Sequence, residues 1–169
     1  SQKACDLVCA IVGIKEFIKA LNNTDLDPIY FCEILHACPA GPDNAAMTLV
    51  SVAAQPASIA KGDTVAFALV LDVKNASGVG EFGISVDGPT TQPVSQRFLL
   101  PKGIPAGPQT MGVKLTVQDV DPSGQDPGVH WSPGTYRFTF EVCQGECHSK
   151  HPHSKFFGSK AGNFTLTEN

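Results

Sequence analysis

The spacing of apolar residues divides this chain into a helical first part and a strand-rich remainder. Near the start, apolar side chains recur three and four positions apart, at Leu7, Ile11, Ile14, Ile18 and Leu21. This spacing places them on one face of an α-helix. The polar stretch 22–24 is a turn sequence, so the pattern predicts an amphipathic helix that ends before it.

A second helix is predicted to begin at Asp27-Pro28. The aspartate carboxylate can accept the free amide hydrogens of a first helical turn, and proline suits the first helical position. Phe31, Ile34 and Leu35 can then face the first helix. The sequence Pro-Ala-Gly-Pro at 39–42 is a break, so residues 1–40 are predicted to form a helical hairpin.

Beyond this break the apolar pattern shifts to a period of two, which is typical of strands. Seven candidate strands follow, separated by turn sequences rich in Gly, Pro and Asp: 47–52, 64–73, 79–86, 94–100, 111–117, 135–142 and 163–167. The expected fold class is mainly β with an N-terminal α-helical hairpin. We expect residues 45–169 to form an Ig-like or fibronectin-like β-sandwich of about seven strands.

Composition agrees with a turn-rich β protein, because only 17% of residues are charged while Gly and Pro number 16 and 13. The net charge of -4 argues against nucleic acid as a partner, since binding phosphates requires a basic surface. The first apolar stretch, at 10–14, is far shorter than a membrane-spanning helix requires.

Three Asn-x-Ser/Thr triplets begin at Asn22, Asn75 and Asn163, and none has proline in the middle. Each is an acceptor sequence for N-linked glycan. Three such triplets together with six cysteines predict a secreted, N-glycosylated protein in which the cysteines form disulfides.

Four of the cysteines lie in the predicted hairpin, at Cys5, Cys9, Cys32 and Cys38. In an antiparallel hairpin the start of the first helix lies beside the end of the second. The nested pairing Cys5–Cys38 with Cys9–Cys32 therefore fits best, and the crossed pairing is the alternative. The hairpin is too short to hold a core of its own, so it is expected to depend on these disulfides.

The segment Asp27–Pro39, with its Cys-x5-Cys, resembles part of a saposin-type domain, whose partner helix also carries a close cysteine pair. That family more often has Cys-x2-Cys where Cys5 and Cys9 are four apart, and it has four or five helices. The resemblance therefore implies half of a saposin fold.

The combination of a saposin-like start and a β domain is similar to the countin-type secreted proteins of amoebae. The segments 134–136, 143–147 and 150–154 contribute to this similarity. It implies an extracellular factor that acts in cell association without enzymatic activity.

The densest cluster of reactive side chains consists of Cys143, Cys147, His148, His151 and His153. Two thiols and three imidazoles so close together are a candidate Zn²⁺ or Cu site. In an oxidising compartment a Cys143–Cys147 disulfide followed by a His-rich loop is favoured, so no metal and no other cofactor is expected. No Gly-x-Ser-x-Gly nucleophile motif occurs, and we expect no enzymatic activity.

These observations predict a non-catalytic extracellular adhesion or assembly protein whose partners are its own copies or other extracellular proteins. The two amphipathic helices have more apolar surface than so short a hairpin can cover, which favours assembly into oligomers or fibrils. The alternative is a saposin-like protein that binds lipid or a membrane surface through the same helices.

Overall fold

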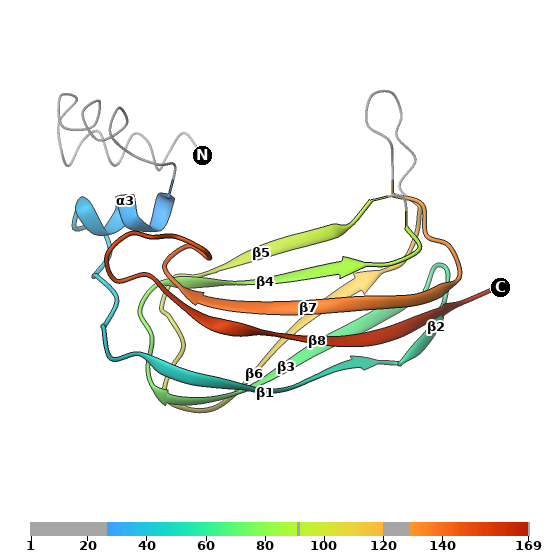
Figure 1. The fold of residues 1–169 in the computed structure, drawn as a ribbon, viewed down its shortest axis with the longest axis horizontal. Coiled ribbons are helices and arrows are strands. Elements are labelled where there is room, and N and C mark those ends of the chain that lie inside the picture. The colour runs from blue at the N-terminus through green and yellow to red at the C-terminus, as the bar shows by residue number, and fades with distance from the viewer. Residues whose placement is uncertain (1–26, 91, 120–128, 169) are drawn as a thin grey trace, which may run out of the picture.

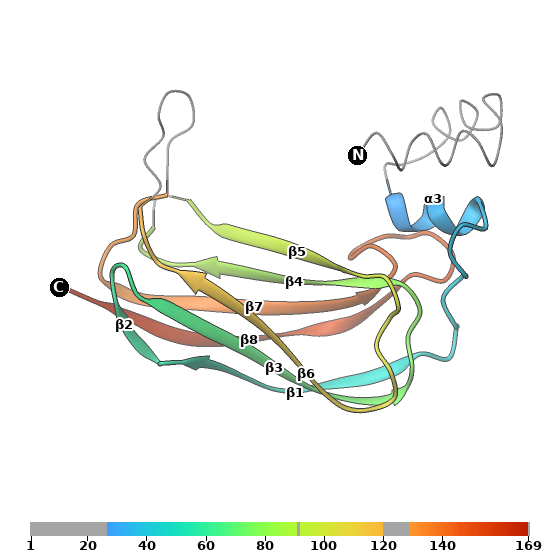
Figure 2. The same cartoon turned by 180° about the vertical axis from the view of Figure 1, so that it is seen from behind.

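The described part of the chain is built from two β-sheets and one short helix. A computed structural model describes residues 27–90, 92–119 and 129–168. The first predicted helix therefore lies outside the described residues. In Figure 1 the five-stranded sheet lies nearer the viewer, and Figure 2 brings the three-stranded sheet to the front.

The order of strands differs from their order in the chain. The three-stranded sheet runs β1 (Ala46–Gln55), β3 (Thr64–Asn75), β6 (Gly107–Thr116). The five-stranded sheet runs β2 (Ser58–Ala60), β8 (Lys155–Thr167), β7 (Gly134–Gln144), β4 (Gly80–Asp87), β5 (Val94–Leu100). Neighbouring strands are antiparallel, except that β2 runs parallel to β8.

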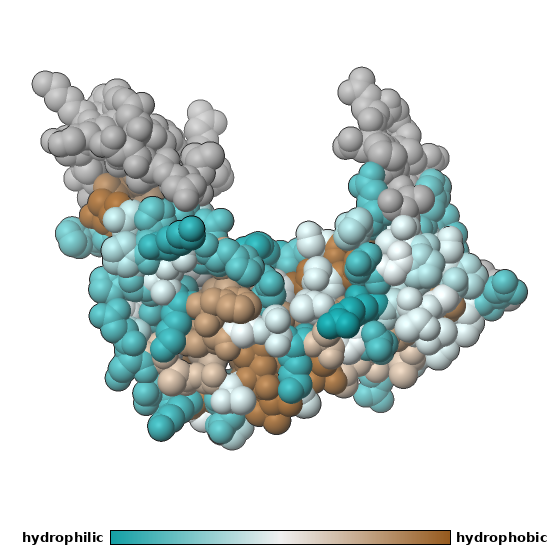
Figure 3. Space-filling view, viewed as in Figure 1, coloured by the Kyte–Doolittle hydropathy of each residue, from teal (hydrophilic) through white to brown (hydrophobic). Residues whose placement is uncertain are grey.

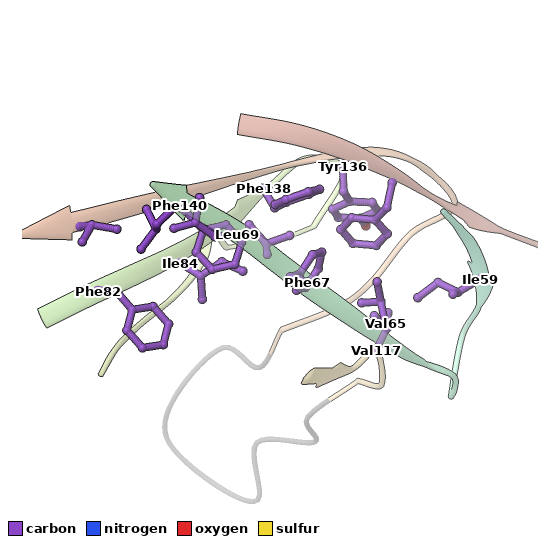
Figure 4. Close-up of a cluster of buried hydrophobic side chains, with 14 of the residues drawn as sticks. Ile59, Val65, Phe67, Leu69, Phe82, Ile84, Val117, Tyr136, Phe138 and Phe140 are labelled. Carbon is purple, nitrogen blue, oxygen red and sulfur yellow. The ribbon is translucent and has the colours of Figure 1, made fainter. Parts of the chain in front are cut away.

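The core lies between the two sheets and follows from the period-two pattern of their central strands. Strand β3 alternates buried and less buried positions, and Val65, Phe67, Leu69 and Leu71 point inward as predicted. Strand β7 supplies the opposing aromatic side chains, and the rings of Phe67 and Phe138 lie 4.7 Å apart. Figure 4 shows these side chains meeting between the layers.

All seven predicted strands are present, together with one that the sequence did not predict. The additional strand, β2, has only three residues, which is too short for a periodic pattern to indicate. Strand β8 begins at Lys155 rather than near Asn163, because its first half mixes polar and apolar residues around a register shift opposite Val142 and Cys143. The count among described residues is therefore eight strands.

The helix α3 (Pro28–Ile34) begins where the sequence predicted. The Asp27 carboxylate accepts hydrogen bonds from the amides of Ile29 and Tyr30 at 3.0 and 2.9 Å. The helix ends earlier than expected, because His36 adopts a left-handed backbone conformation with φ of 53°. Cys38 therefore lies beyond the helix rather than at its end.

Candidate functional site

The helix α3 and the loop between β7 and β8 meet at one end of the two sheets (Figure 1). We call residues 145–154 the histidine loop, because it contains His148, His151 and His153. The predicted disulfide between Cys143 and Cys147 forms at its base, with the Cα atoms 5.2 Å apart. The Glu81 carboxylate accepts a hydrogen bond of 2.7 Å from the Cys147 amide and holds the loop against β4.

Helix α3 is attached to the histidine loop by contacts that span more than one hundred residues of sequence. The second carboxylate oxygen of Asp27 accepts a 2.7 Å hydrogen bond from the Ser149 hydroxyl. The Tyr30 ring stacks on the His151 ring with centroids 4.0 Å apart and planes 4° apart. Asp27 is 5% exposed, so its charge is compensated by amide and hydroxyl donors rather than by water.

The three histidines do not converge on a common point. His148 contacts the Glu141 carboxylate at 3.1 Å, His153 contacts the Asp43 carboxylate at 2.8 Å, and His151 stacks on Tyr30. Among the residues that the structure describes, no group of three or more side chains is arranged to hold a metal ion. Each histidine of the loop therefore has a contact partner of its own.

A cavity of about 550 Å³ opens between α3 and the histidine loop. The residues that line it include Tyr30, Glu33, His36, Cys38 and His153. Burial raises the pKa of the Cys38 thiol to about 12, with a hydrogen bond to Cys32 and nearby negative charge acting in the same direction. A thiol with that pKa is protonated at neutral pH and is a poor nucleophile.

A buried amide fastens the histidine loop to the segment that follows α3. The Gln144 side chain is completely buried and donates through Nε2 to the carbonyl oxygens of Pro42 and His153, at 3.1 and 2.7 Å. Its Oε1 accepts from the Gly78 amide at 2.8 Å. No local pattern in the sequence marks Gln144 or Asp27 as a linking residue, because their partners are remote in the chain.

The predicted hairpin disulfides fall on the boundary of the described residues. Cys32 and Cys38 are described, and no disulfide joins either of them within that part of the chain. Cys5 and Cys9 lie outside it. Both the nested and the crossed pairing therefore stay predictions.

The glycosylation triplets lie in different settings. Asn22 lies outside the described residues. Asn75 ends β3 and donates to the Asn44 carbonyl at 2.8 Å, while the buried Ser77 of the same triplet accepts from the Ile104 amide at 2.9 Å. Asn163 is exposed on β8. Within the described ranges, no helix is long and apolar enough to cross a membrane.

The contact between His153 and Asp43 predicts how the stability of the fold depends on pH. A hydrogen bond with Asp43, together with its charge, raises the pKa of His153 above 6.5. Since the folded pKa is raised, this contact stabilises the fold fully below the unfolded pKa and loses its effect as pH rises through the folded pKa. Asp43→Asn should return the pKa of His153 towards its ordinary value, as measured by NMR titration of the imidazole.

The control for that titration is Asp72→Asn, which removes an exposed carboxylate from β3. This variant should leave the pKa of His153 unchanged. An equal fall in both variants would show that the general negative charge of the protein, rather than the Asp43 contact, sets the pKa.

Comparisons with known proteins point to one family over nearly the whole chain. Residues 1–36 match the model of the Countin N-terminal domain, and residues 47–169 match that of the Countin C-terminal domain. Countin-1 of Dictyostelium discoideum is 31% identical over 163 residues, which cover 96% of this chain and 60% of that protein. Countin-3 of the same organism is 32% identical over 162 residues, which cover 96% of this chain and 69% of that protein.

The chain therefore spans about two thirds of the length of these two curated relatives, at 60% and 69%. Among solved structures, the DNA glycosylase AlkC of Pseudomonas fluorescens shares part of the backbone arrangement, with a TM-score of 0.48 and 16% identity. That match covers 73% of this chain and 31% of the glycosylase. We draw nothing about function from a similarity at this level.

Proposed function

This chain belongs to the countin family, and from that membership we propose that it is a secreted, N-glycosylated adhesion or assembly protein without catalytic activity. Its partners in this proposal are further copies of itself or other extracellular proteins. The edge of β1 that does not pair with β3 is the observation that carries the proposal, and β8 of the other sheet lies close to part of it. An unpaired strand edge presents amide and carbonyl groups that a strand of another chain can bind.

Strand β1 is a long edge strand of the three-stranded sheet, and its sequence contains no charged residue. It runs for ten residues, AMTLVSVAAQ, and pairs only with β3. The other edges carry Arg97 on β5 and Lys114 on β6, and β2 has only three residues. The part of β8 that β2 does not cover carries Lys155 and Lys160. Charged side chains on an edge oppose association, so their absence makes β1 the preferred docking edge.

An irregularity in the pairing of β1 adds apolar surface to this edge. The register shifts between Leu49 and Ser51, and Val50 between them is 49% exposed. Figure 3 shows hydrophobic residues along the lower margin of the molecule, where Figure 1 places β1. An apolar side chain beside open backbone groups favours pairing with a second copy.

We also assign the two-sheet region to the Ig-like class, and we retain a helical hairpin at 1–40 and a β domain at 45–169 as the domain division. The sheet orders β1-β3-β6 and β2-β8-β7-β4-β5 support the Ig-like class. The Tyr136 hydroxyl at the start of β7 donates to the Ser132 carbonyl at 2.8 Å. This contact matches the tyrosine corner of Ig-like domains.

The chemistry of the described residues supports a non-catalytic role. Cys143 is joined to Cys147, and Cys38 is predicted to form a disulfide as well. His148 and His153 contact carboxylates rather than a Ser or Cys nucleophile.

Val50→Lys is expected to weaken association about tenfold or more, because lysines on two paired β1 edges repel each other. Light scattering and electron microscopy of the secreted protein should then show a shift from larger particles towards the 17.8 kDa monomer plus glycan. Thr110→Lys is the matched control, since it places the same charge on an exposed position of the β6 edge. It should leave the particle size unchanged.

Two outcomes would count against this proposal. A wild-type protein that is monodisperse at the monomer mass would contradict assembly. Co-sedimentation with vesicles in the absence of self-association would favour the saposin-like alternative.

A further inference from the structure

The outer face of the five-stranded sheet contains a polar hollow of about 240 Å³. Strand pairing explains its shape. Gly83 on β4 lies between Arg97 on β5 and Glu141 on β7, so a residue without a side chain separates two long ones. The next outward row consists of three short hydroxyl side chains, Ser95, Ser85 and Thr139. Figure 3 looks onto this side of the molecule.

Nothing in the backbone of β4 requires glycine at position 83. Its φ is not in the positive range, and neither the β4–β5 nor the β4–β7 pairing shows an irregularity there. A Cβ at this position would meet the Arg97 side chain and the Gln96 carbonyl at the ordinary contact distances of 3.6 and 3.7 Å. Glycine inside a strand weakens it, and one recurring reason for its presence is the close approach of a ligand.

The groups around the hollow fit a neutral molecule that carries many hydroxyls. Arg97 supplies donors, Glu141 supplies acceptors, and the serine and threonine hydroxyls can do both. Both long side chains already have a partner, since Arg97 contacts the Glu81 carboxylate at 2.6 Å and Glu141 contacts His148 at 3.1 Å. An anion would meet the Glu141 carboxylate, and the described residues contain no group of three or more side chains that could hold a metal ion here.

The size of the hollow and its rim point to one sugar unit. A volume of about 240 Å³ is below the range of drug-sized sites, which begins at about 300 Å³. Phe156 is 47% exposed, and its ring lies 5.2 Å from that of His148 on the wall of the hollow. An exposed aromatic ring beside polar groups can pack against the C–H face of a pyranose.

We propose that this hollow binds a saccharide. The proposal rests on the extracellular setting proposed above, and it names a ligand class for a face other than the β1 edge. One source of saccharide is the chain itself, because Asn163 lies opposite Arg137 on the same outward face. Asn163 lies on the neighbouring strand, two residues along from the partner of Thr139. A glycan on Asn163 would therefore be attached about 8 Å from Thr139.

Gly83→Val is the decisive variant, because it fills the hollow while improving strand propensity. Amide chemical shifts of Ser85, Ser95 and Thr139 in the full-length, deglycosylated protein should move on titration with N-acetylglucosamine or mannose. Gly83→Val should weaken this binding at least about tenfold without lowering the unfolding temperature. Thr139→Val, which removes one hydroxyl at nearly constant volume, should weaken it as well.

The control is Gly112→Val, which adds the same side chain to the outer face of the other sheet, on the edge strand β6, and it should bind as the wild type does. Asn163→Gln separates the two sources of saccharide. If the chain's own glycan fills the hollow, free sugar should bind to Asn163→Gln but not to the glycosylated wild type. If the saccharide comes from another molecule, both should bind.

Either pattern supports the proposal. Absence of shifts in both the deglycosylated protein and Asn163→Gln would overturn it, and so would full binding by Gly83→Val. The particle size of the same samples reports on assembly through β1 independently, so failure of one proposal is distinguishable from failure of the other.

Discussion

Replacing Phe67 by alanine is expected to lower the free energy of unfolding by about 3 to 5 kcal/mol. The Phe67 side chain is 1% exposed and joins the two sheets. Its ring lies 4.7 Å from that of Phe138 on β7 and 5.4 Å from that of Phe164 on β8. Truncation removes the buried apolar area and leaves a void that the flanking rings can fill only in part. Urea unfolding followed by Trp131 fluorescence measures the loss.

The control for this variant is Phe156→Ala, since Phe156 is 47% exposed. That substitution should change the free energy of unfolding by no more than about 0.5 kcal/mol. A loss below about 1 kcal/mol in Phe67→Ala would mean that the two sheets do not share one packed core.

Gln144→Met is expected to cost about 3 to 5 kcal/mol, although it keeps the length of the side chain. The substitution leaves the Gly78 amide and the carbonyl oxygens of Pro42 and His153 without their buried partner. Each buried polar group that loses its partner costs roughly 1 to 3 kcal/mol. Besides the fall in stability, hydrogen exchange should become faster in residues 41–45 and in the histidine loop.

The same substitution at Gln109 is the matched control. Gln109 makes one exposed hydrogen bond of 3.3 Å to the Pro105 carbonyl, so Gln109→Met should change stability by no more than about 0.5 kcal/mol. Equal losses in the two variants would show that a general effect of methionine, rather than the buried contacts of Gln144, accounts for the result.

These two residues differ in how far the sequence reveals them. Phe67 lies in a clear alternation of apolar and less apolar residues, and this pattern is sufficient to predict that it faces the core. Gln144 is the last residue of β7, but in the sequence it looks like the start of a polar loop. Its role depends on Pro42, 102 residues away, which no local pattern indicates.

The candidate site shows the same division. The Cys143–Cys147 disulfide and the start of α3 at Asp27 were predictable, because a short loop and a helix cap are both local structures. The contact of Asp27 with Ser149 and the hollow around Gly83 were not. The hollow exists only because pairing brings Arg97 and Glu141 to either side of a glycine.

By itself, the sequence indicated seven of the eight described strands, the start of α3, and which face of each central strand is buried. These features depend on side-chain period, capping and turn residues within a few positions of one another. Only the tertiary structure decided the order of strands in each sheet, the docking of α3 on the histidine loop and the edge position of β1. The reason is that strand pairing and edge position are set by contacts between residues far apart in the chain, whose energy no local pattern records.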